Sequence, residues 1–301
     1  MAKQVLVTGA SGFVGSRLAE ALVAAGHRVR AMTRHPDEYD GAGEPVAGDV
    51  DDPASLRAAL DGVDAAYYLV HSLGDDDFER RDADAARSFA SAAATAGVAR
   101  IIYLGGLGDD DGTLSAHLRS RREVEGLLGT GGVPVTVLRA AIVIGHGGIS
   151  WELTRQLVDH LPVMVAPRWV NTRTQPIALP DVIRYLVGVL EPDAALGAVY
   201  EVGGPEVVRY IDMLKVVARI QNKRPLPVVM LPLLTPQLSS MWLALVTDVD
   251  IPTARNLVDS MTNEVVVHDD SIRTLVPGDP LGFEEAVRLA LADRRAAKAA
   301  G

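Results

Sequence analysis

Hydrophobic residues recur along the first half of the chain in two alternating patterns. Short apolar runs of strand type are separated by longer segments in which apolar side chains return every three or four residues. In the segment Ser16–Ala25, for example, Leu18, Leu22 and Ala25 share one helical face, and Gly26 supplies a stop signal. Strands that alternate with amphipathic helices predict an α/β fold, a doubly wound parallel sheet covered by helices on both faces.

The expected elements follow from this alternation. Predicted strands cover Val5–Val7, Arg28–Met32, Val46–Gly48, Ala65–Val70, Ile101–Leu104, Val133–Arg139 and Ala198–Val202. Predicted helices cover Ser16–Ala25, Asp52–Leu60, Phe78–Ala96 and Leu114–Leu128. The pair Asp52-Pro53 is a clear helix start, because Asp caps free backbone N–H groups and Pro suits the first helical position.

A glycine-rich turn, Thr8-Gly9-Ala10-Ser11-Gly12-Phe13-Val14-Gly15, joins the first predicted strand to the first predicted helix. Glycines at this point of a βαβ unit permit a tight turn, bring backbone N–H groups to a pyrophosphate and let the helix pack closely on the strand. The alternative is a turn that is merely tight. The expected cofactor-binding residues here are Gly9, Ser11, Gly12, Phe13, Val14 and Gly15, with the Ser11 hydroxyl donating to phosphate.

The residues after the second and third strands indicate which dinucleotide binds. No acid lies at the end of the second strand, where an NAD enzyme places Asp or Glu on the ribose 2′-hydroxyl, and Arg34 follows instead. An arginine there can pair with a 2′-phosphate, which predicts NADP(H), although a solvated surface arginine is the alternative. Asp49 and Val50 follow the third strand, and Asp49 either accepts from the adenine amino group or only caps the turn into Asp52-Pro53.

The pattern loosens after Gly145, where strand, helix and irregular segments mix with dense proline. We therefore expect residues 1–145 to form a Rossmann-type NAD(P)-binding domain, with strand and helix returns around 174–202. Residues 146–301 are expected to form mainly a smaller, mixed substrate-binding lobe. The most apolar stretch, Pro225–Val246, is interrupted by prolines, so we interpret it as lobe core or pocket wall rather than a membrane contact.

Composition narrows the possible partners. The net charge of −10 argues against nucleic acid, and the absence of cysteine excludes disulfides, thiolate nucleophiles and cysteine metal sites. No metal site is expected, since histidines with two-ligand spacing on a helix are missing. The chain enters a strand without a signal peptide, which makes the cytoplasm the expected location. Neither substrate identity nor oligomeric state follows from these features.

Five segments together resemble the short-chain dehydrogenase/reductase superfamily, in its extended and atypical NmrA-like branch. They are the Thr8–Gly15 turn, Val29–Arg34, Gly48–Val50, Val135–Ala140 and Tyr200–Pro205. The resemblance implies a parallel sheet of about seven strands, a cofactor across its carboxyl edge and a substrate held by the variable C-terminal lobe.

This sequence departs from the superfamily at the residues that carry its chemistry. The usual Ser or Thr at the end of the fifth strand is replaced by Leu104-Gly105-Gly106, and none of the seven tyrosines has Lys four residues later. His117 and Arg121 occupy the two positions of the usual Tyr and Lys, one helical turn apart. We therefore predict His117 as proton donor, with activity favoured at mildly acidic pH, and Arg121 as ribose anchor; the alternative is a solvated helix face.

Two further features bear on the substrate. His71, just after the fourth strand, is expected to face the cofactor edge, where it contacts nicotinamide or substrate or is simply structural. The segment Arg168–Arg173 combines two arginines with an aromatic, near Trp151, Met164 and Trp242 in the expected lobe. Such residues suit an apolar pocket with an anionic or carbonyl handle, or else surround the lobe core.

The leading hypothesis is an oxidoreductase, an NADPH-dependent reductase of an apolar carbonyl, enone or quinone-like small molecule. Two alternatives follow from the missing Ser, Tyr and Lys. One is a non-catalytic NADP(H)-binding redox sensor. The other is an accessory or assembly subunit in which a bound nucleotide only stabilises the fold.

Overall fold

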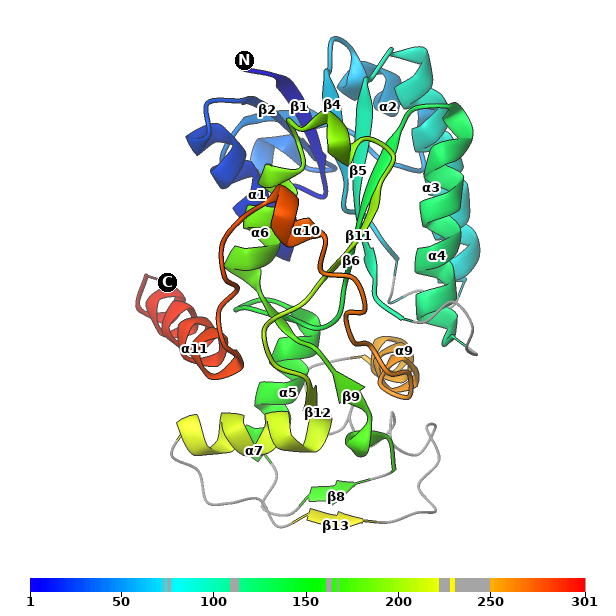
Figure 1. Cartoon of the computed structure of the whole chain (residues 1–301). Helices are drawn as coiled ribbons and strands as arrows, with labels where there is room; N and C mark the ends of the chain where they lie inside the picture. The colour runs from blue at the N-terminus through cyan, green and yellow to red at the C-terminus, as the bar shows by residue number, and fades with distance from the viewer. Residues whose placement is uncertain are drawn as a thin grey trace.

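The computed structural model of the protein describes residues 1–72, 74, 77–108, 114–160, 164–166, 168–221, 228–230 and 250–300. Within these ranges a sheet forms the upper part of the molecule, and a group of helices and short strands lies below it (Figure 1). The two termini lie apart, with the C-terminal helix beside the lower group.

The sheet has seven strands in the order β11-β6-β5-β4-β1-β2-β3. Every neighbouring pair runs parallel. The strands are β1 (Gln4–Thr8), β2 (Arg28–Thr33), β3 (Glu44–Ala47), β4 (Ala65–Tyr68), β5 (Arg100–Gly106), β6 (Val135–Ala140) and β11 (Val199–Val202). This order, with its reversal between β1 and β4, confirms the predicted doubly wound Rossmann-type sheet.

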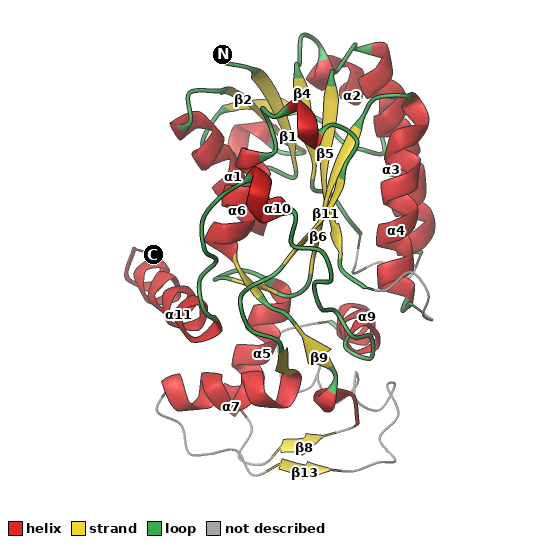
Figure 2. Cartoon of the chain, in the orientation of Figure 1, coloured by secondary structure: helices red, strands yellow, loops and turns green. Residues whose placement is uncertain are grey.

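Helices cover both faces of the sheet (Figure 2). One face carries α1 (Phe13–Ala24) and α6 (Leu179–Gly188), and the other carries α2 (Pro53–Leu60), α3 (Phe78–Thr95) and α4 (Ala116–Leu128). Each layer buries its own apolar core, with Leu18 and Leu22 of α1 on one side and Leu56 of α2 and Phe89 of α3 on the other. The sheet is therefore buried on both faces, as its nearly continuous apolar strands predict.

Two helices begin at other residues than the sequence predicts. α1 begins at Phe13 rather than Ser16, so the end of the glycine-rich turn is already the first helical turn. α4 begins at Ala116 rather than Leu114, because the Ser115 side chain caps the helix and accepts from the Leu118 N–H at 3.3 Å. The remaining strand and helix ends shift by a few residues.

The C-terminal part contains α5 (Ile149–His160), α7 (Tyr210–Ile220), α9 (Ile251–Ser260), α10 (Ile272–Leu275) and α11 (Phe283–Ala300). Its short strands pair as β7 (Val143–Ile144) with β10 (Ile177–Ala178), β9 (Arg173–Thr174) with β12 (Val208–Arg209), and β8 (Met164–Ala166) with β13 (Val228–Met230). Single-turn 3-10 helices are η1 (Pro36–Glu38), η2 (Gly129–Gly131), η3 (Arg168–Asn171) and η4 (Asp193–Ala195). A separate apolar core joins α5, α7, α9 and α11.

The apolar stretch Pro225–Val246 lies outside the described residues except for the backbone of β13. Its predicted role as lobe core or pocket wall therefore stays a prediction. Among the helices that the structure describes, none has the length and apolar character needed to cross a membrane.

Candidate active site

The glycine-rich turn uses its three glycines for different purposes. Gly9 has a φ of +63°, a conformation that side chains disfavour. A Cβ on Gly15 would lie 2.1 Å from the Gly9 carbonyl oxygen, so the start of α1 can pack on the turn only if residue 15 has no side chain. Gly12 has an ordinary φ of −82° and donates its N–H to the Gly9 carbonyl at 2.9 Å.

The turn forms one wall of a cavity of about 690 Å³, called here the turn cavity. All the sequence-predicted cofactor residues line it: Gly9, Ser11, Gly12, Phe13, Val14, Gly15, Arg34, Asp49, Val50 and His71. The cavity runs along the carboxyl edge of the strands and past the N-terminus of α1, where free backbone N–H groups favour an anion. The residues present therefore fit a dinucleotide.

Arg34 and Asp49 lie at one end of the turn cavity. Arg34 is exposed and has no hydrogen bond or ion pair to a residue that the structure describes. Asp49 is already engaged locally, since its Oδ1 accepts the Asp51 N–H at 3.0 Å and its carbonyl accepts the Asp52 N–H at 3.0 Å. Asp49 thus performs the turn-capping role that the sequence left as an alternative, and one carboxylate oxygen is still available to a ligand.

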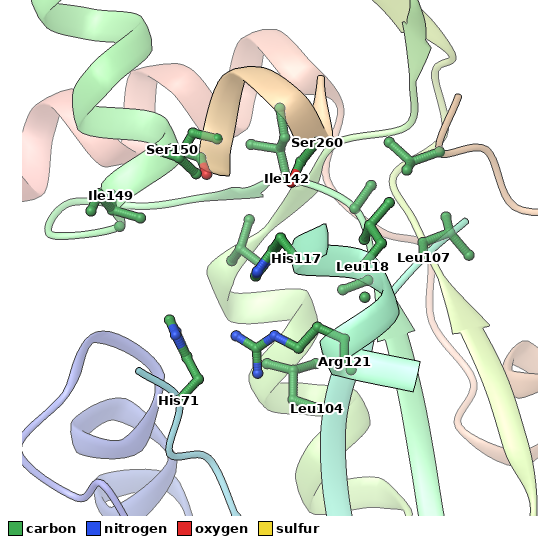
Figure 3. A pocket seen from close by; sticks show the side chains of 18 of the residues that line it. His71, Leu104, Leu107, His117, Leu118, Arg121, Ile142, Ile149, Ser150 and Ser260 are labelled. Atoms are coloured by element: carbon green, nitrogen blue, oxygen red, sulfur yellow. The ribbon is translucent and has the colours of Figure 1, made fainter. Parts of the chain in front are cut away.

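A second cavity of about 220 Å³, called here the apolar cavity, opens between the sheet and the C-terminal part. Its apolar lining comes from Leu104, Leu107, Leu118, Ala140, Ala141, Ile142, Val143, Ile149, Leu257, Met261 and Val265. Polar side chains enter it from the loop after β4, from α4, from α5 and from α9, namely His71, His117, Arg121, Ser150 and Ser260 (Figure 3). Such a cavity suits an apolar molecule with a polar group at one end.

The two cavities share Phe13, Val14, His71, Leu104 and Arg121. At this junction the Arg121 guanidinium points toward the space beside His71 and His117 (Figure 3). Among the described residues it forms no ion pair, and a side-chain hydrogen bond links it to the buried Tyr103 hydroxyl. The tertiary structure thus brings His71, more than forty positions away in the sequence, to the helix that carries His117 and Arg121.

The electrostatics of the junction keep both imidazoles neutral. Their ring centroids lie 6.5 Å apart. Burial, together with the Arg121 charge, lowers the pKa of His117 to about 3. The Arg121 charge, followed by burial and by His117, holds the pKa of His71 well below its ordinary value. His71 nevertheless remains accessible from the cleft, so the positive charge of Arg121 is the main cause of its lowered pKa.

These shifts bear on one sequence expectation, that His117 titrates near neutral pH and donates its proton as an imidazolium. Burial and the Arg121 charge both disfavour the protonated ring, and the role of His117 as proton donor stays a prediction. Sequence reasoning anticipated the direction of the Arg121 effect but not its combination with burial. A neutral imidazole can still donate one N–H hydrogen bond.

Arg173 and Trp151, which the sequence placed near an apolar pocket, do not line the apolar cavity. Arg173 is exposed and forms a two-point ion pair with Glu264, with Nε to Oε2 at 2.8 Å. Trp151 is fully buried in the core of the C-terminal part. The side chains of Arg168, Trp169 and Met164, and all of Trp242, lie outside the described residues.

Sequence reasoning also missed residues that shape the junction. Gly145 and Gly148 pack on Phe13, and a Cβ on Gly148 would lie 2.8 Å from the Phe13 ring. Tyr210, Ser150 and Ser260 line the apolar cavity from helices of the C-terminal part. The glycines in Gly145-His146-Gly147-Gly148 were a visible signal, whereas the others became recognisable only once the helices were placed.

Comparison with known proteins agrees with this geometry. A family described as NAD(P)H-binding matches residues 9–161. The (4-alkanoyl-5-oxo-2,5-dihydrofuran-3-yl)methyl phosphate reductase of Streptomyces griseus subsp. griseus is 31% identical over 234 residues, which cover 74% of this chain and 75% of that protein. The ceramide reductase of Caulobacter vibrioides is 30% identical over 167 residues, which cover 53% of this chain and 52% of that protein. An uncharacterized protein of Mycobacterium tuberculosis is 28% identical over 62% of this chain, but the match covers only 20% of its length.

Solved structures share the fold at lower identity. The triphenylmethane reductase of Citrobacter sp., complexed with NADP(H), has a TM-score of 0.77 and 18% identity, with 95% of this chain and 99% of that chain covered. The NADPH-dependent quinone oxidoreductase of Escherichia coli, complexed with NADPH, has a TM-score of 0.77 and 21% identity, with 94% and 98% covered.

The glycine-rich turn, the doubly wound sheet and these matches lead to one assignment. The chain belongs to the NAD(P)H-binding reductase family, within the atypical NmrA-like branch of the short-chain dehydrogenase/reductase superfamily.

Proposed function

We propose that the chain is an NADPH-dependent reductase that acts on an apolar carbonyl, enone or quinone-like small molecule. The observation that carries this proposal is the junction at which the turn cavity continues into the apolar cavity. A dinucleotide on the turn would be bound by the backbone N–H groups that begin α1, with Arg34 facing a 2′-phosphate. When bound, the cofactor supplies the hydride that the substrate accepts.

The polar end of the apolar cavity suits the charge that this reaction creates. A carbonyl or conjugated carbonyl that accepts hydride develops negative charge on its oxygen. The Arg121 guanidinium, which forms no ion pair with a described residue, and an N–H of neutral His117 are donors on the same face of α4, directed into the cavity. Fixed donors in a site that excludes water stabilise such charge strongly. The apolar lining excludes water and holds the rest of the substrate.

The neutral imidazoles favour conjugated acceptors over simple ketones. A ketone reduced to an alkoxide depends on prompt protonation, and neither His71 nor His117 holds a proton to give at neutral pH. An enone or quinone yields a delocalised anion, which Arg121 can hold until water protonates it. The relatives support this class, since the Streptomyces reductase acts on an alkanoyl-oxo-dihydrofuranyl phosphate and the E. coli neighbour is a quinone oxidoreductase.

The test is turnover of NADPH by the purified protein with matched quinones, enones, ketones and aldehydes. We expect oxidation of NADPH with conjugated acceptors, at a rate that varies little between pH 6 and 8 because no histidine at the junction titrates there. Arg121→Ala should lower kcat roughly 10²- to 10³-fold, the typical effect of removing an oxyanion donor. Arg119→Ala is the control, since Arg119 is exposed on the same helix and pairs with Glu79.

His117 has its own variant in the same assay. His117→Phe should slow turnover less than Arg121→Ala does, because it removes a neutral hydrogen bond rather than a charge. A rate that instead falls sharply as pH rises through neutrality would restore the imidazolium as acid. Full activity of both variants would remove this face of α4 from the reaction.

A redox sensor that does not turn over its cofactor is the second candidate. It is favoured by the end of β5, where Leu104, Gly105 and Gly106 offer no hydroxyl, and by the absence of a Tyr-x-x-x-Lys pair. A sensor requires unequal binding of oxidised and reduced cofactor. If no acceptor is reduced, calorimetry with NADP⁺ and NADPH decides: a large difference in Kd supports the sensor, and equal values contradict it.

A further inference from the structure

The junction is assembled from two segments whose described residues form no direct hydrogen bond or ion pair with each other. His71 lies in the loop after β4, whereas His117 and Arg121 lie on α4. The two histidine rings pack edge to face with their centroids 6.5 Å apart, and this contact alone does not fix their positions. A hydride-transfer site needs its groups held to within a fraction of an ångström, so another part of the fold must set their separation.

Asp82 of α3 provides that connection. Its Oδ1 accepts the backbone N–H of Ser72 at 2.8 Å, and its Oδ2 accepts the hydroxyl of Ser120 at 3.4 Å. Ser72 directly follows His71, and Ser120 directly precedes Arg121. One carboxylate therefore holds the neighbour of each junction residue, and Asp82 itself lines neither the apolar cavity nor the turn cavity.

Neither helix capping nor apolar packing accounts for a carboxylate at position 82. Asp82 is only 6% exposed and Ser120 only 2%. Asp82 lies in the second turn of α3, beyond its N-cap Asp77, so it does not cap its own helix. The other buried residues of α3 are alanines with Phe78 and Phe89, which pack without the cost of burying a charge.

The charge of Asp82 has a complement in Arg121. Burial raises the pKa of Asp82, and the Arg121 charge is the largest influence in the opposite direction, followed by the bonds from Ser72 and Ser120. The two groups form no ion pair within 4 Å. The negative charge of Asp82, which lies outside the apolar cavity, thus offsets the positive charge of Arg121, while the guanidinium stays directed into the cavity.

α4 is held at a second point, near its N-terminus. The Ser115 N–H donates to Asn263 Oδ1 at 2.9 Å, and the Ser115 and Ser260 hydroxyls lie 3.4 Å apart. These contacts fix α4 against α9, but they do not reach the loop that carries His71. Among the hydrogen bonds of the described residues, the link between α4 and that loop passes through Asp82.

We propose that Asp82 is a positioning residue that fixes His71 and Arg121 relative to each other at the junction of the two cavities. The inference deepens the proposed function and rests on it where turnover is the readout. It assigns a role to a residue that touches neither cofactor nor substrate.

The test compares Asp82→Ala, Asp82→Asn and the control Asp84→Ala. Asp84 lies on the same helix but is exposed and pairs with Arg87. Asp82→Ala should lower kcat roughly 10- to 100-fold, the range expected when reacting groups move by about an ångström. The KM for the acceptor and the Kd of NADPH should change less than about threefold, because positioning acts on the reacting geometry rather than on cofactor binding.

Asp82→Asn separates geometry from charge. Its amide oxygen can accept from Ser72 and its amide N–H can donate to the Ser120 oxygen, so most of the rate should return. The imidazole NMR resonances of His71 and His117 give a readout without turnover. They should shift in Asp82→Ala, while remaining near the wild-type positions in Asp82→Asn and Asp84→Ala.

The outcomes are distinguishable. If wild-type protein reduces no acceptor, the proposed function fails, while the imidazole resonances still test the positioning role. If Asp82→Ala keeps the wild-type kcat and resonances, or loses kcat and NADPH binding in the same proportion, the positioning role is overturned. If Asp82→Ala does not fold, Ser120→Ala removes only the α4 half of the bridge and should still shift the resonance of His117.

Discussion

Gly12 and Gly15 lie three residues apart in the turn but differ in what a side chain would meet. A Cβ on Gly12 has one neighbour, the Gly9 carbonyl oxygen at 3.1 Å, and otherwise faces the turn cavity. A Cβ on Gly15 would overlap the Gly9 carbonyl at 2.1 Å. A side chain at position 12 would thus conflict mainly with a ligand in the turn cavity, whereas a side chain at position 15 would conflict with the protein backbone.

This contrast predicts different outcomes for two variants. Gly12→Val should fold with little change in Tm but lose measurable NADPH binding, because its side chain fills the space of the pyrophosphate. Gly15→Val should lower Tm strongly, because helix α1 can no longer pack on the turn. Calorimetry and thermal melting check the pair. Wild-type affinity in a folded Gly12→Val protein would place the dinucleotide elsewhere.

Arg34 decides the cofactor preference in the proposed function. It is exposed at the turn cavity, where no acidic side chain follows β2. Arg34→Ala should remove a charge-assisted contact of roughly 1.5–3 kcal/mol to the 2′-phosphate, weakening NADPH far more than NADH. Arg28→Ala, on the exposed first residue of β2, is the matched control and should affect neither. Equal losses for both cofactors in Arg34→Ala would exclude Arg34 from phosphate recognition.

At the scale of elements, α4 connects the sheet to the C-terminal part. It packs against α3 on one side and α9 on the other. Ser115 serves both purposes, since it caps α4 through the Leu118 N–H and contacts Ser260 and Asn263. The helix that carries His117 and Arg121 is therefore anchored at its start to the wall of the apolar cavity.

Ser115→Ala should consequently change both the stability of the protein and its KM for the acceptor. Loss of the cap alone costs roughly 0.5–2 kcal/mol of unfolding free energy. Because α9 also lines the apolar cavity, we expect KM for the acceptor to rise while the Kd of NADPH stays unchanged. Denaturant titration and steady-state kinetics measure the two effects. Thr130→Ala is the control and should leave KM unchanged. Thr130 lies just after the end of α4, and its hydroxyl donates to the Leu127 carbonyl.

At the scale of the whole molecule, the junction makes stability depend on pH. His117 has its pKa lowered to about 3 in the folded chain, whereas an unfolded histidine titrates near 6.5. Between these values the unfolded chain binds more protons, so acid favours unfolding. The stabilising effect of neutral His117 is fully present above pH 6.5 and is lost as pH falls toward 3. His71 acts in the same direction.

The expected slope for one such histidine is at most about 1.4 kcal/mol of unfolding free energy per pH unit. His117 is only partly buried, so the measured slope should be smaller. Denaturant titrations at several values between pH 5 and 8 should show stability falling below pH 6.5. The fall should be shallower in His117→Phe than in the wild-type chain. Identical slopes would show that His117 titrates normally in the folded state.

The sequence alone determined the sheet, the turn and the cofactor class, because these depend on local periodicity and on backbone geometry that only glycine permits. Gly9, Gly12 and Gly15 lie in one short segment, and their spacing already requires a tight strand-to-helix turn. The sequence also predicts that His117 and Arg121 occupy the positions of the usual Tyr and Lys, and this assignment stays a prediction.

Only the tertiary structure decided the charge state of His117 and which residues lie beside it. The neutral state of His117 depends on its burial and on Arg121, and the meeting of His71 with α4 depends on the crossover from β4 to β5. Asp82 could not be singled out from an alanine-rich helix, because its partners Ser72 and Ser120 lie 10 and 38 positions away. Burial and long-range electrostatics arise from the packing of distant segments, which no local pattern encodes.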